Sequence, residues 1–459
     1  MANDAVRDQV TDPAIERVPG TPNLLLGAYD VSTLGYAAQE HFLSGTATSY
    51  VPQPSTADYV TRIVVMTPTD PERFSGAVVV EWLNVSGGID APAVWFMAHR
   101  EIVRAGHAYV AVSAQRVGIE GGASMGMDMS LKTLDAARYG ALTHPGDAYA
   151  YDIYSQVGRL VRDRADELLG GLQPETVLAI GESQSALFLT TYVNVVDPLA
   201  QVYDGFLVHS RFGPAAPLDG SSIFDDDSAD PQPVPFSDDL RVPVMTVITE
   251  TDLVGGVRAG YHLARQPDGD RLRAWEVAGT AHADNYTIKV GFIDSGAAPL
   301  DDLVAGYAPT TTLMGQELPH CINFAPQHHY VLQAALAHLV AWVRTGELPP
   351  TAERMDLTDA EPPQLVLDAN GLATGGVRTP WVDVPIARTS GIGSAEPLMA
   401  MLFGSGEVFD ADTVARLYPG GAAEYIDRFT QSLDAAIEAG FLLAADRQEI
   451  LDLAAATYP

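Results

Sequence analysis

The chain alternates short apolar runs with longer segments of helical periodicity, and this alternation constrains its fold more than any other feature. The apolar runs are rich in β-branched residues, as buried strands are. They lie at residues 61–67, 77–83, 107–113, 176–180, 203–208, 242–248 and 272–278. The helical segments are clearest at residues 93–105, 152–170, 184–196 and 329–345. Strands that alternate with helices predict an α/β protein with a mostly parallel central sheet flanked by helices.

The segments outside this alternation predict two additions to the sheet. Residues 24–52 are expected to form an antiparallel strand or hairpin at its leading edge. Residues 211–240 are rich in turn-forming and acidic residues and separate two strands, so they are too polar to be core. We expect them to form a lid-like surface insert over one end of the sheet.

A Gly and Pro stop, TGELPP, follows the helical segment that ends at residue 345. The sequence therefore predicts a core over residues 1–350 and a C-terminal extension over residues 351–459, packed on the core. Within the extension, residues 364–385 have the pattern of β-structure and residues 395–459 that of helices.

The charge of the chain excludes several classes of partner. Its 459 residues include 26 Lys and Arg against 59 Asp and Glu, so the formal charge is 26 − 59 = −33. Lys132 and Lys289 are the only lysines, and no basic patch for nucleic acid can form. An acidic surface repels anionic lipid, and no apolar run reaches the roughly 18 residues of a membrane span.

Residues 1–13 lack the pattern of a secretory signal, so we expect a cytoplasmic protein. Nothing in the sequence indicates the oligomeric state.

The most informative motif for chemistry is Gly181-Glu182-Ser183-Gln184-Ser185, which lies between an apolar strand and a helical run. This is the strand–turn–helix setting of a nucleophile elbow. Its turn strains the backbone at the serine, so the residues two before and two after it must be small. Gly181 and Ser185 meet this requirement, and Ser183 is the candidate nucleophile.

A literal G-x-S-x-G match occurs at residues 122–126, around Ser124. It is preceded by QRVGIEGG, which has no strand pattern, and followed by only a weak start to a helix. Glycines at this density indicate a loop. Ser124 is therefore the weaker candidate.

A serine nucleophile needs a hydrogen-bonded base, and the base needs a carboxylate that fixes its tautomer. His282 is the histidine that follows a strand and a loop of small residues, and it is the candidate base. A further strand ends in Glu250-Thr251-Asp252, at the edge where open α/β sheets hold their sites. Asp252 is our first choice for the acid because it lies past the strand end, and Glu250 is the alternative. The alternative role of Asp252 is to cap a helix.

An oxyanion hole requires two backbone N–H groups. The elbow supplies that of Gln184. The second is expected from the loop after the strand at 77–83, where Asn84 is the candidate and Val85 and Ser86 are the alternatives.

Three further residues are candidates for substrate binding. Trp82 ends a strand beside the predicted oxyanion loop, and Glu182 directly precedes the nucleophile. Arg211 follows another strand and falls at the same sheet edge. Its guanidinium has two expected roles, which are to bind a substrate carboxylate or carbonyl, or to pair with an aspartate of the insert.

Metal and nucleotide sites have little support. The chain has no H-E-x-x-H, no P-loop and no G-x-G-x-x-G after a strand. Asp225, Asp226 and Asp227 are better explained as a solvated acidic loop than as a Ca²⁺ site. Cys321 is the only cysteine, which excludes an intrachain disulfide and a multi-cysteine metal site. We expect no cofactor and no metal.

Over residues 60–346 the chain resembles the α/β-hydrolase superfamily, through GESQSA, ITETDL and GTAH in this order. More narrowly, EWLNVSGG, residues 138–156 and residues 375–385 are similar to a bacterial group known as "alpha/beta hydrolase domain". The resemblance implies a parallel-sheet core with an antiparallel leading strand, metal-independent ester chemistry and an acyl-enzyme intermediate.

The predicted function is hydrolysis of small carboxylic esters by a Ser-His-Asp triad. Acyl transfer or lactone hydrolysis would use the same residues, because only the nucleophile that reaches the acyl-enzyme differs. A catalytically silent binding module with the same fold is the third alternative.

Overall fold

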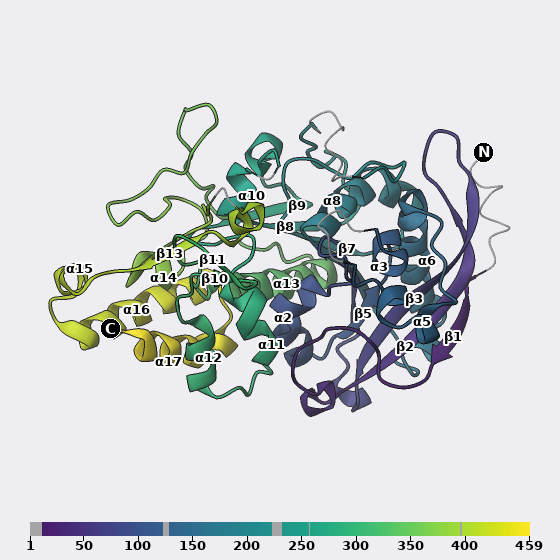
Figure 1. Ribbon diagram of the computed structural model, residues 1–459, viewed down its shortest axis with the longest axis horizontal. Coiled ribbons are helices and arrows are strands. Elements are labelled where there is room, and N and C mark those ends of the chain that lie inside the picture. Colours follow the sequence, from purple (N-terminus) through teal and green to yellow (C-terminus); the bar gives the residue numbers. More distant parts are fainter. Residues whose placement is uncertain (1–11, 123–127, 223–231, 257, 395–396) are drawn as a thin grey trace.

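A computed structural model describes residues 12–122, 128–222, 232–256, 258–394 and 397–459. Within these residues one nine-stranded sheet runs through the molecule, with helices on both of its faces (Figure 1). In the order in which they pair, its strands are β1 (Ala14–Val18), β2 (Tyr36–Thr48), β3 (Thr56–Pro68), β5 (Ala108–Val112), β4 (Ala77–Trp82), β6 (Thr176–Glu182), β7 (Gly205–His209), β8 (Val244–Thr249) and β9 (Leu272–Val277).

The part of the sheet from β5 to β9 is parallel throughout. Every residue of β4, β5, β7, β8 and β9 is buried, as expected of strands with helices on both faces. The seven apolar runs correspond to β3 through β9. The prediction of a mostly parallel α/β sheet is therefore confirmed.

The leading edge of the sheet is antiparallel. β3 pairs with β5 in this sense, β2 pairs with β3 along its whole length, and the exposed strand β1 covers β2. The strand expected within residues 24–52 is thus β2, and its hairpin partner is β3.

Each face of the sheet has its own helices and its own apolar core. Val79 of β4 packs in the cluster that contains α2 (Ala93–Arg104) and α13 (Gln327–Thr345). Its neighbours Val78 and Val80 point to the other face and pack with α6 (Ala150–Asp163) and α8 (Gln184–Thr191). The helix predicted at 184–196 continues past α8 as the π-helical turn η4 (Tyr192–Val196). α13 ends where Gly346 takes a φ of 77°, which favours glycine.

The C-terminal residues form a helical layer at the end of the molecule opposite β1 (Figure 1). Its helices are α14 (Pro380–Asp383), α15 (Ala411–Leu417), α16 (Gly421–Glu438) and α17 (Arg447–Thr457). A short hairpin of β12 (Ala387–Ser390) and β13 (Ser405–Val408) accompanies them. Their apolar side chains extend the α2 and α13 cluster, and α17 contacts α12 (Leu300–Tyr307). The division of the chain at residue 350 stays a prediction.

Residues 364–385 do not form a regular strand, so the prediction of β-structure there is wrong. This stretch forms isolated bridges between single residue pairs and then the short helix α14. Gly371, Gly375 and Gly376 all take positive φ values between 70° and 79°, and each turns the chain before a ladder can extend. Its buried leucines instead fill a small cluster against the end of β8.

The other elements are short. They are η1 (Val31–Leu34), η2 (Pro71–Arg73), α3 (Arg116–Glu120), α4 (Leu131–Leu134), α5 (Ala136–Tyr139), η3 (Asp147–Tyr149), α7 (Ala165–Leu168), α9 (Asp197–Ala200), α10 (Glu250–Val254), η5 (Tyr261–Ala264), η6 (Tyr286–Val290), α11 (Gly291–Ile293), β10 (Thr312–Leu313), β11 (Gln316–Glu317), η7 (Leu398–Phe403) and η8 (Ala444–Asp446). Among the helices of the described chain, none has both the length and the apolar character needed to cross a membrane.

Candidate active site

Ser183 lies in a strained turn between β6 and α8, with φ 57° and ψ −117°. The chain turns so tightly that a Cβ on Gly181 would lie 3.1 Å from the Cβ of Ser185 and 2.9 Å from Leu189 Cδ1. Gly181 therefore cannot carry a side chain without displacing its neighbours. The Ser183 N–H donates to the carbonyl of His209 at the end of β7, at 3.0 Å, and this bond fixes the turn to the sheet edge.

His282 reaches Ser183 from the loop after β9. Its Nε2 is 2.8 Å from Ser183 Oγ, and its Nδ1 is 2.6 Å from Asp252 Oδ1. The three side chains come from the carboxyl ends of three different strands. They form one hydrogen-bonded chain from carboxylate to imidazole to hydroxyl.

Asp252 is held in place by the first turn of α10. Thr249 caps this helix. Asp252 Oδ2 accepts hydrogen bonds from the backbone N–H of Thr249 at 2.9 Å and from the Thr249 hydroxyl at 2.7 Å. The other carboxylate oxygen is left for His282. Asp252 thus lies within the first turn of α10 and bonds back to its cap, Thr249, and it does not cap a helix that follows it in the described chain.

Glu250, the alternative acid, faces away from the imidazole. Its Oε1 accepts the Gly279 N–H at 2.6 Å, and its Oε2 accepts the Ser390 hydroxyl at 2.8 Å and the Gly391 N–H at 2.7 Å. Burial raises the pKa of this carboxyl, although these donors act against the shift. Glu250 therefore ties the C-terminal segment at 390–391 to the loop that carries His282.

A second carboxyl group lies beside the imidazole. Glu182 Oε1 is 3.5 Å from His282 Nε2, and the Asn84 side-chain amide donates to Glu182 Oε2 at 3.2 Å and to its carbonyl at 3.0 Å. Burial raises the pKa of Glu182 to about 7, against the attraction of His282.

The pKa of His282 is raised above its ordinary value. Burial on its own lowers this pKa, but the charge of Asp252, its hydrogen bond and the charge of Glu182 together outweigh that effect. The imidazole is thus surrounded by groups that stabilise its protonated form.

The N–H groups near Ser183 differ in their availability. Gln184 is the first residue of α8, and its backbone N–H donates to no acceptor within the described residues. The Asn84 N–H donates to Ala91 O at 2.9 Å, and the Ser86 N–H donates to Asn84 Oδ1 at 2.8 Å. The Val85 N–H has only a long contact of 3.4 Å with the Gln184 side chain. The choice of Asn84 over Val85 is therefore corrected, because a β-bridge already occupies the Asn84 donor.

A family model of the alpha/beta hydrolase domain matches residues 10–452. The chain belongs to this family. The sheet, the order of its strands and the helices on both faces accordingly form an α/β-hydrolase fold. A comparison with curated proteins finds no match for this sequence.

Solved structures resemble this α/β hydrolase only distantly. A candidate dienelactone hydrolase of Klebsiella pneumoniae is 13% identical with a TM-score of 0.33, and the match covers 57% of this chain and 93% of that one. An esterase of Pyrococcus furiosus is 10% identical with a TM-score of 0.30, covering 57% and 88%. A thermostable esterase of Pseudomonas putida is 11% identical with a TM-score of 0.29, covering 49% and 66%.

Trp82 lies in the core of the hydrolase, which corrects its assignment to substrate binding. Its indole is fully buried and packs on Tyr154 and Phe188. The indole N–H donates to Gln115 Oε1 at 3.0 Å, and the same oxygen accepts from the Gln184 side chain at 2.8 Å. Trp82 thus supports Gln184, the residue that follows Ser183, from within the core.

Arg211 is also fully buried, at the base of the insert. Its guanidinium donates to the carbonyls of Phe212 at 3.0 Å, Gly213 at 2.9 Å and Val234 at 2.6 Å, and so joins the two described arms of the insert. Burial lowers the pKa of Arg211 to about 10. Within the described residues it forms no ion pair, so the expected pair with an aspartate of the insert is not seen there.

Two side chains that contact His282 were missed in the sequence. The Phe212 ring stacks on the imidazole with centroids 5.3 Å apart, and Thr251 Oγ1 accepts the His282 N–H at 3.2 Å. Thr251 was visible as the residue between the two candidate acids. Ser124 and the aspartates at 225–227 lie outside the described residues.

Proposed function

We propose that the protein is a carboxylic ester hydrolase in which Ser183 is the nucleophile, His282 the general base and acid, and Asp252 the carboxylate that orients the histidine. The observation that carries this proposal is the hydrogen-bonded chain from Asp252 Oδ1 through His282 to Ser183 Oγ, with links of 2.6 and 2.8 Å at a strained strand-to-helix turn. This is the arrangement that activates a serine hydroxyl near neutral pH.

In the first half of the reaction Ser183 Oγ attacks the acyl carbon of the ester while its proton passes to His282 Nε2. Asp252 accepts the Nδ1–H and so keeps Nε2 free to take that proton. The tetrahedral intermediate then collapses. The C–O bond to the alcohol breaks, His282 returns the proton to the leaving oxygen, and an acyl-enzyme remains on Ser183.

In the second half a water molecule takes the place of the alcohol. His282 removes one proton from it, the hydroxide attacks the acyl carbon, and the intermediate collapses to the carboxylic acid. The proton on Nε2 returns to Ser183 Oγ. The acid and the alcohol are thus released in separate steps.

The oxyanion of each tetrahedral intermediate needs two donors. We assign these to the backbone N–H groups of Gln184 and Val85. The Val85 N–H exchanges its long contact with the Gln184 side chain for the oxyanion. Removal of a single donor in such a site commonly costs a factor of about 10²–10³ in kcat.

The test combines labelling and turnover. A fluorophosphonate probe is expected to label the folded wild-type protein and Ser124→Ala, but not Ser183→Ala, and a panel of uncharged esters with varied acyl and alcohol groups is expected to be hydrolysed. A protein that is not labelled and hydrolyses none of the esters would be a silent scaffold. If an added alcohol takes the acyl group in preference to water, the enzyme is an acyltransferase.

A further inference from the structure

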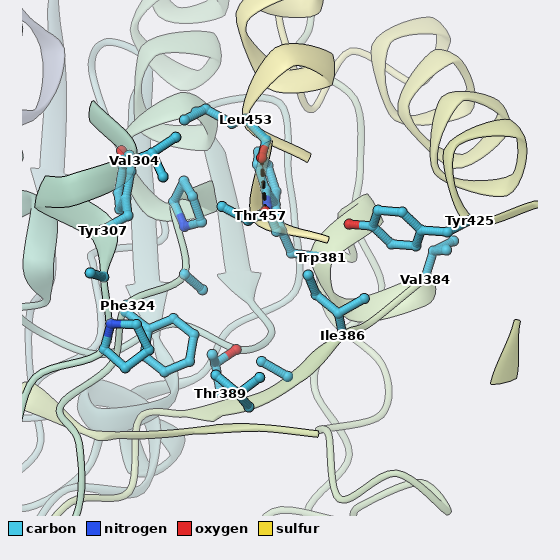
Figure 2. Close-up of a pocket in the computed structure, with 16 residues that line it drawn as sticks. Val304, Tyr307, Phe324, Trp381, Val384, Ile386, Thr389, Tyr425, Leu453 and Thr457 are labelled. Carbon is cyan, nitrogen blue, oxygen red and sulfur yellow. Dashed lines mark hydrogen bonds between the residues drawn. The ribbon is translucent and has the colours of Figure 1, made fainter. Parts of the chain in front are cut away.

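A cavity of about 250 Å³ lies between the hydrolase core and the C-terminal helical layer (Figure 2). One wall comes from the end of α12 and the loop before α13, and the other from α14, β12, α16 and α17. Its lining residues are Val304, Tyr307, Ala308, Pro309, Phe324, Ala325, Pro326, Trp381, Val384, Ile386, Ala387, Thr389, Val408, Tyr425, Leu453 and Thr457. None of them belongs to the proposed catalytic site.

The residues that line the cavity disfavour the binding of a charged ligand. None of the sixteen lining residues is ionised at neutral pH, in a chain with 59 acidic residues. A charged ligand would lose its hydration without gaining an ionic partner. A smaller apolar cavity of about 150 Å³ is enough for benzene. The cavity therefore suits a neutral, mainly apolar molecule with about two fused rings or a similar aliphatic volume.

The hydroxyls of two largely buried residues can supply the polar contact that such a ligand needs. The side chains of Tyr425 and Thr389 come from residues that are 1% and 4% exposed, and both point their oxygens toward the other lining residues in Figure 2. Within the described part of the chain neither oxygen has a hydrogen-bond partner. Neither hydroxyl is used by the described residues, so both are available to a ligand.

The other two hydroxyls of the lining are already bonded. Tyr307 pairs with His329 Nε2 at 3.0 Å, and Thr457 Oγ1 donates to the Leu453 carbonyl at 2.8 Å (dashed in Figure 2). Of the four hydroxyls in the lining, those of Tyr425 and Thr389 are therefore the two that remain unbonded within the described residues. Thr457 provides a matched control for Thr389, because its hydroxyl belongs to the same cavity but is already hydrogen-bonded to the Leu453 carbonyl.

The cavity is connected to the loop that carries His282. Thr389 packs directly on Gly279, since a Cβ there would lie 3.2 Å from Thr389 Oγ1. The next residue, Ser390, donates to Glu250, which accepts the Gly279 N–H through its other oxygen. Gly279 lies three residues before His282.

A second link runs through Asn323, the residue before the lining residue Phe324. Its side-chain amide donates to the carbonyls of Gly279 at 2.9 Å and Ser390 at 3.1 Å. Both walls of the cavity are therefore linked to the loop that carries His282.

We propose that this cavity binds a neutral apolar molecule with one hydrogen-bonding oxygen, such as an aromatic alcohol. We further propose that its occupancy modulates ester hydrolysis through Thr389, Gly279 and the His282 loop. Binding is independent of the proposed function, and only the modulation rests on it. The site is separate from Ser183, so the ligand is neither substrate nor competitive inhibitor.

The binding test uses 2-naphthol, naphthalene and 2-naphthoate in isothermal titration calorimetry with the full chain. We expect 2-naphthol to bind with one molecule per chain, and 2-naphthoate to bind at least about ten-fold more weakly because its charge has no partner. Tyr425→Phe and Thr389→Val are each expected to weaken 2-naphthol about two- to ten-fold while leaving naphthalene unchanged. Thr457→Val is expected to leave both unchanged.

Two further arms separate this site from the catalytic one. Ser183→Ala, and the wild type blocked by a fluorophosphonate, are expected to bind 2-naphthol with unaltered affinity. In turnover assays 2-naphthol is expected to change kcat and not KM alone, and Thr389→Val to reduce this effect in parallel with binding.

Several results would overturn the proposal. They are absence of binding, equal affinity in Tyr425→Phe, Thr389→Val and wild type, loss of binding on blocking Ser183, or purely competitive kinetics. Ala387→Phe, which fills the cavity, is expected to abolish binding, and retention of binding by a folded variant would contradict the location. If 2-naphthol binds as expected but no ester is hydrolysed, the ligand site stands and the proposed function fails.

Discussion

Glu182 Oε1 lies 3.5 Å from His282 Nε2, the same nitrogen that contacts Ser183 Oγ. The imidazole is thus placed between two carboxyl groups, with Asp252 at Nδ1 and Glu182 at Nε2. Asn84 holds the second group in position through the Glu182 carboxylate and carbonyl. The charge of His282 lowers the pKa of Glu182, which burial raises, and the charge of Glu182 raises the pKa of His282, so a change in one group affects the titration of the other.

Glu182→Gln is expected to move the acid limb of the kcat/KM profile to lower pH. A negative charge beside Nε2 stabilises the imidazolium, so its removal lowers the pKa of His282 and preserves the neutral, active form in more acidic solution. At alkaline pH, where His282 is neutral in both proteins, kcat should fall by less than about ten-fold, in contrast to the loss of a triad member. The measurement is kcat/KM for one neutral ester as a function of pH.

Glu182→Asp is the matched control because it retains the charge. Its acid limb is expected to lie nearer that of the wild type than that of Glu182→Gln. An unchanged or upward-shifted limb in Glu182→Gln would show that Glu182 is not ionised beside the imidazole.

Ser183→Ala is expected to lower kcat for ester hydrolysis by a factor of about 10⁴ or more, whereas Ser124→Ala leaves most of it. The reason is that Ser183 has the strained turn and the hydrogen bond to His282. Steady-state kinetics on purified variants with matched circular dichroism spectra would test this. Comparable losses in both would contradict the assignment.

The positions of Ser183, His282 and Asp252 were predictable because each follows a strand end within a few residues, and strand ends have a local signal. Parallel strands end at one edge, so the three candidates could be placed together without knowledge of any long-range contact. The strands themselves were predictable for the same reason, since burial on both faces leaves a continuous apolar run.

The features that could not be predicted depend on distant or conformational partners. Glu250 and Asp252 are two residues apart and equally buried. The bonds of Glu250 to distant partners such as Gly391, 141 positions away, show why its carboxylate turns from the histidine. The Asn84 N–H is blocked by a bridge to Ala91, which leaves no pattern in the sequence. The identity of Trp82 as a tryptophan does not indicate whether its side chain faces the core or the site. The cavity in Figure 2 joins segments more than 100 residues apart.

Asp252→Asn is expected to lose activity, whereas Glu250→Gln is expected to lose stability. Asp252→Asn removes the acceptor for His282 Nδ1–H and is expected to lower kcat by about 10⁴ with the fold retained. Glu250→Gln replaces one acceptor oxygen by an NH₂ group. That group faces either the donors of Ser390 and Gly391 or the Gly279 N–H, and two donors cannot bond to each other. The substitution is therefore expected to cost about 1–3 kcal/mol of stability.

Chemical denaturation and kinetics on the same preparations distinguish the two outcomes. A Glu250→Gln protein that keeps its stability but loses as much kcat as Asp252→Asn would transfer the acid role to Glu250. The thermal midpoint of Asp252→Asn checks that its loss of activity is not a loss of fold.

Arg211→Met is expected to destabilise the protein and to change KM equally for acid-bearing and neutral esters. The buried guanidinium binds the carbonyls of Phe212, Gly213 and Val234, and its removal leaves these acceptors without their donor, at a cost of about 1–3 kcal/mol. The rings of Phe236 and Tyr261 lie over the same group at 4.9 and 5.4 Å, and methionine keeps part of that packing. Because Phe212 also stacks on His282, a modest loss of kcat for both ester classes should accompany the loss of stability. A selective rise in KM for acid-bearing esters, with stability unchanged, would instead identify Arg211 as a substrate-binding residue.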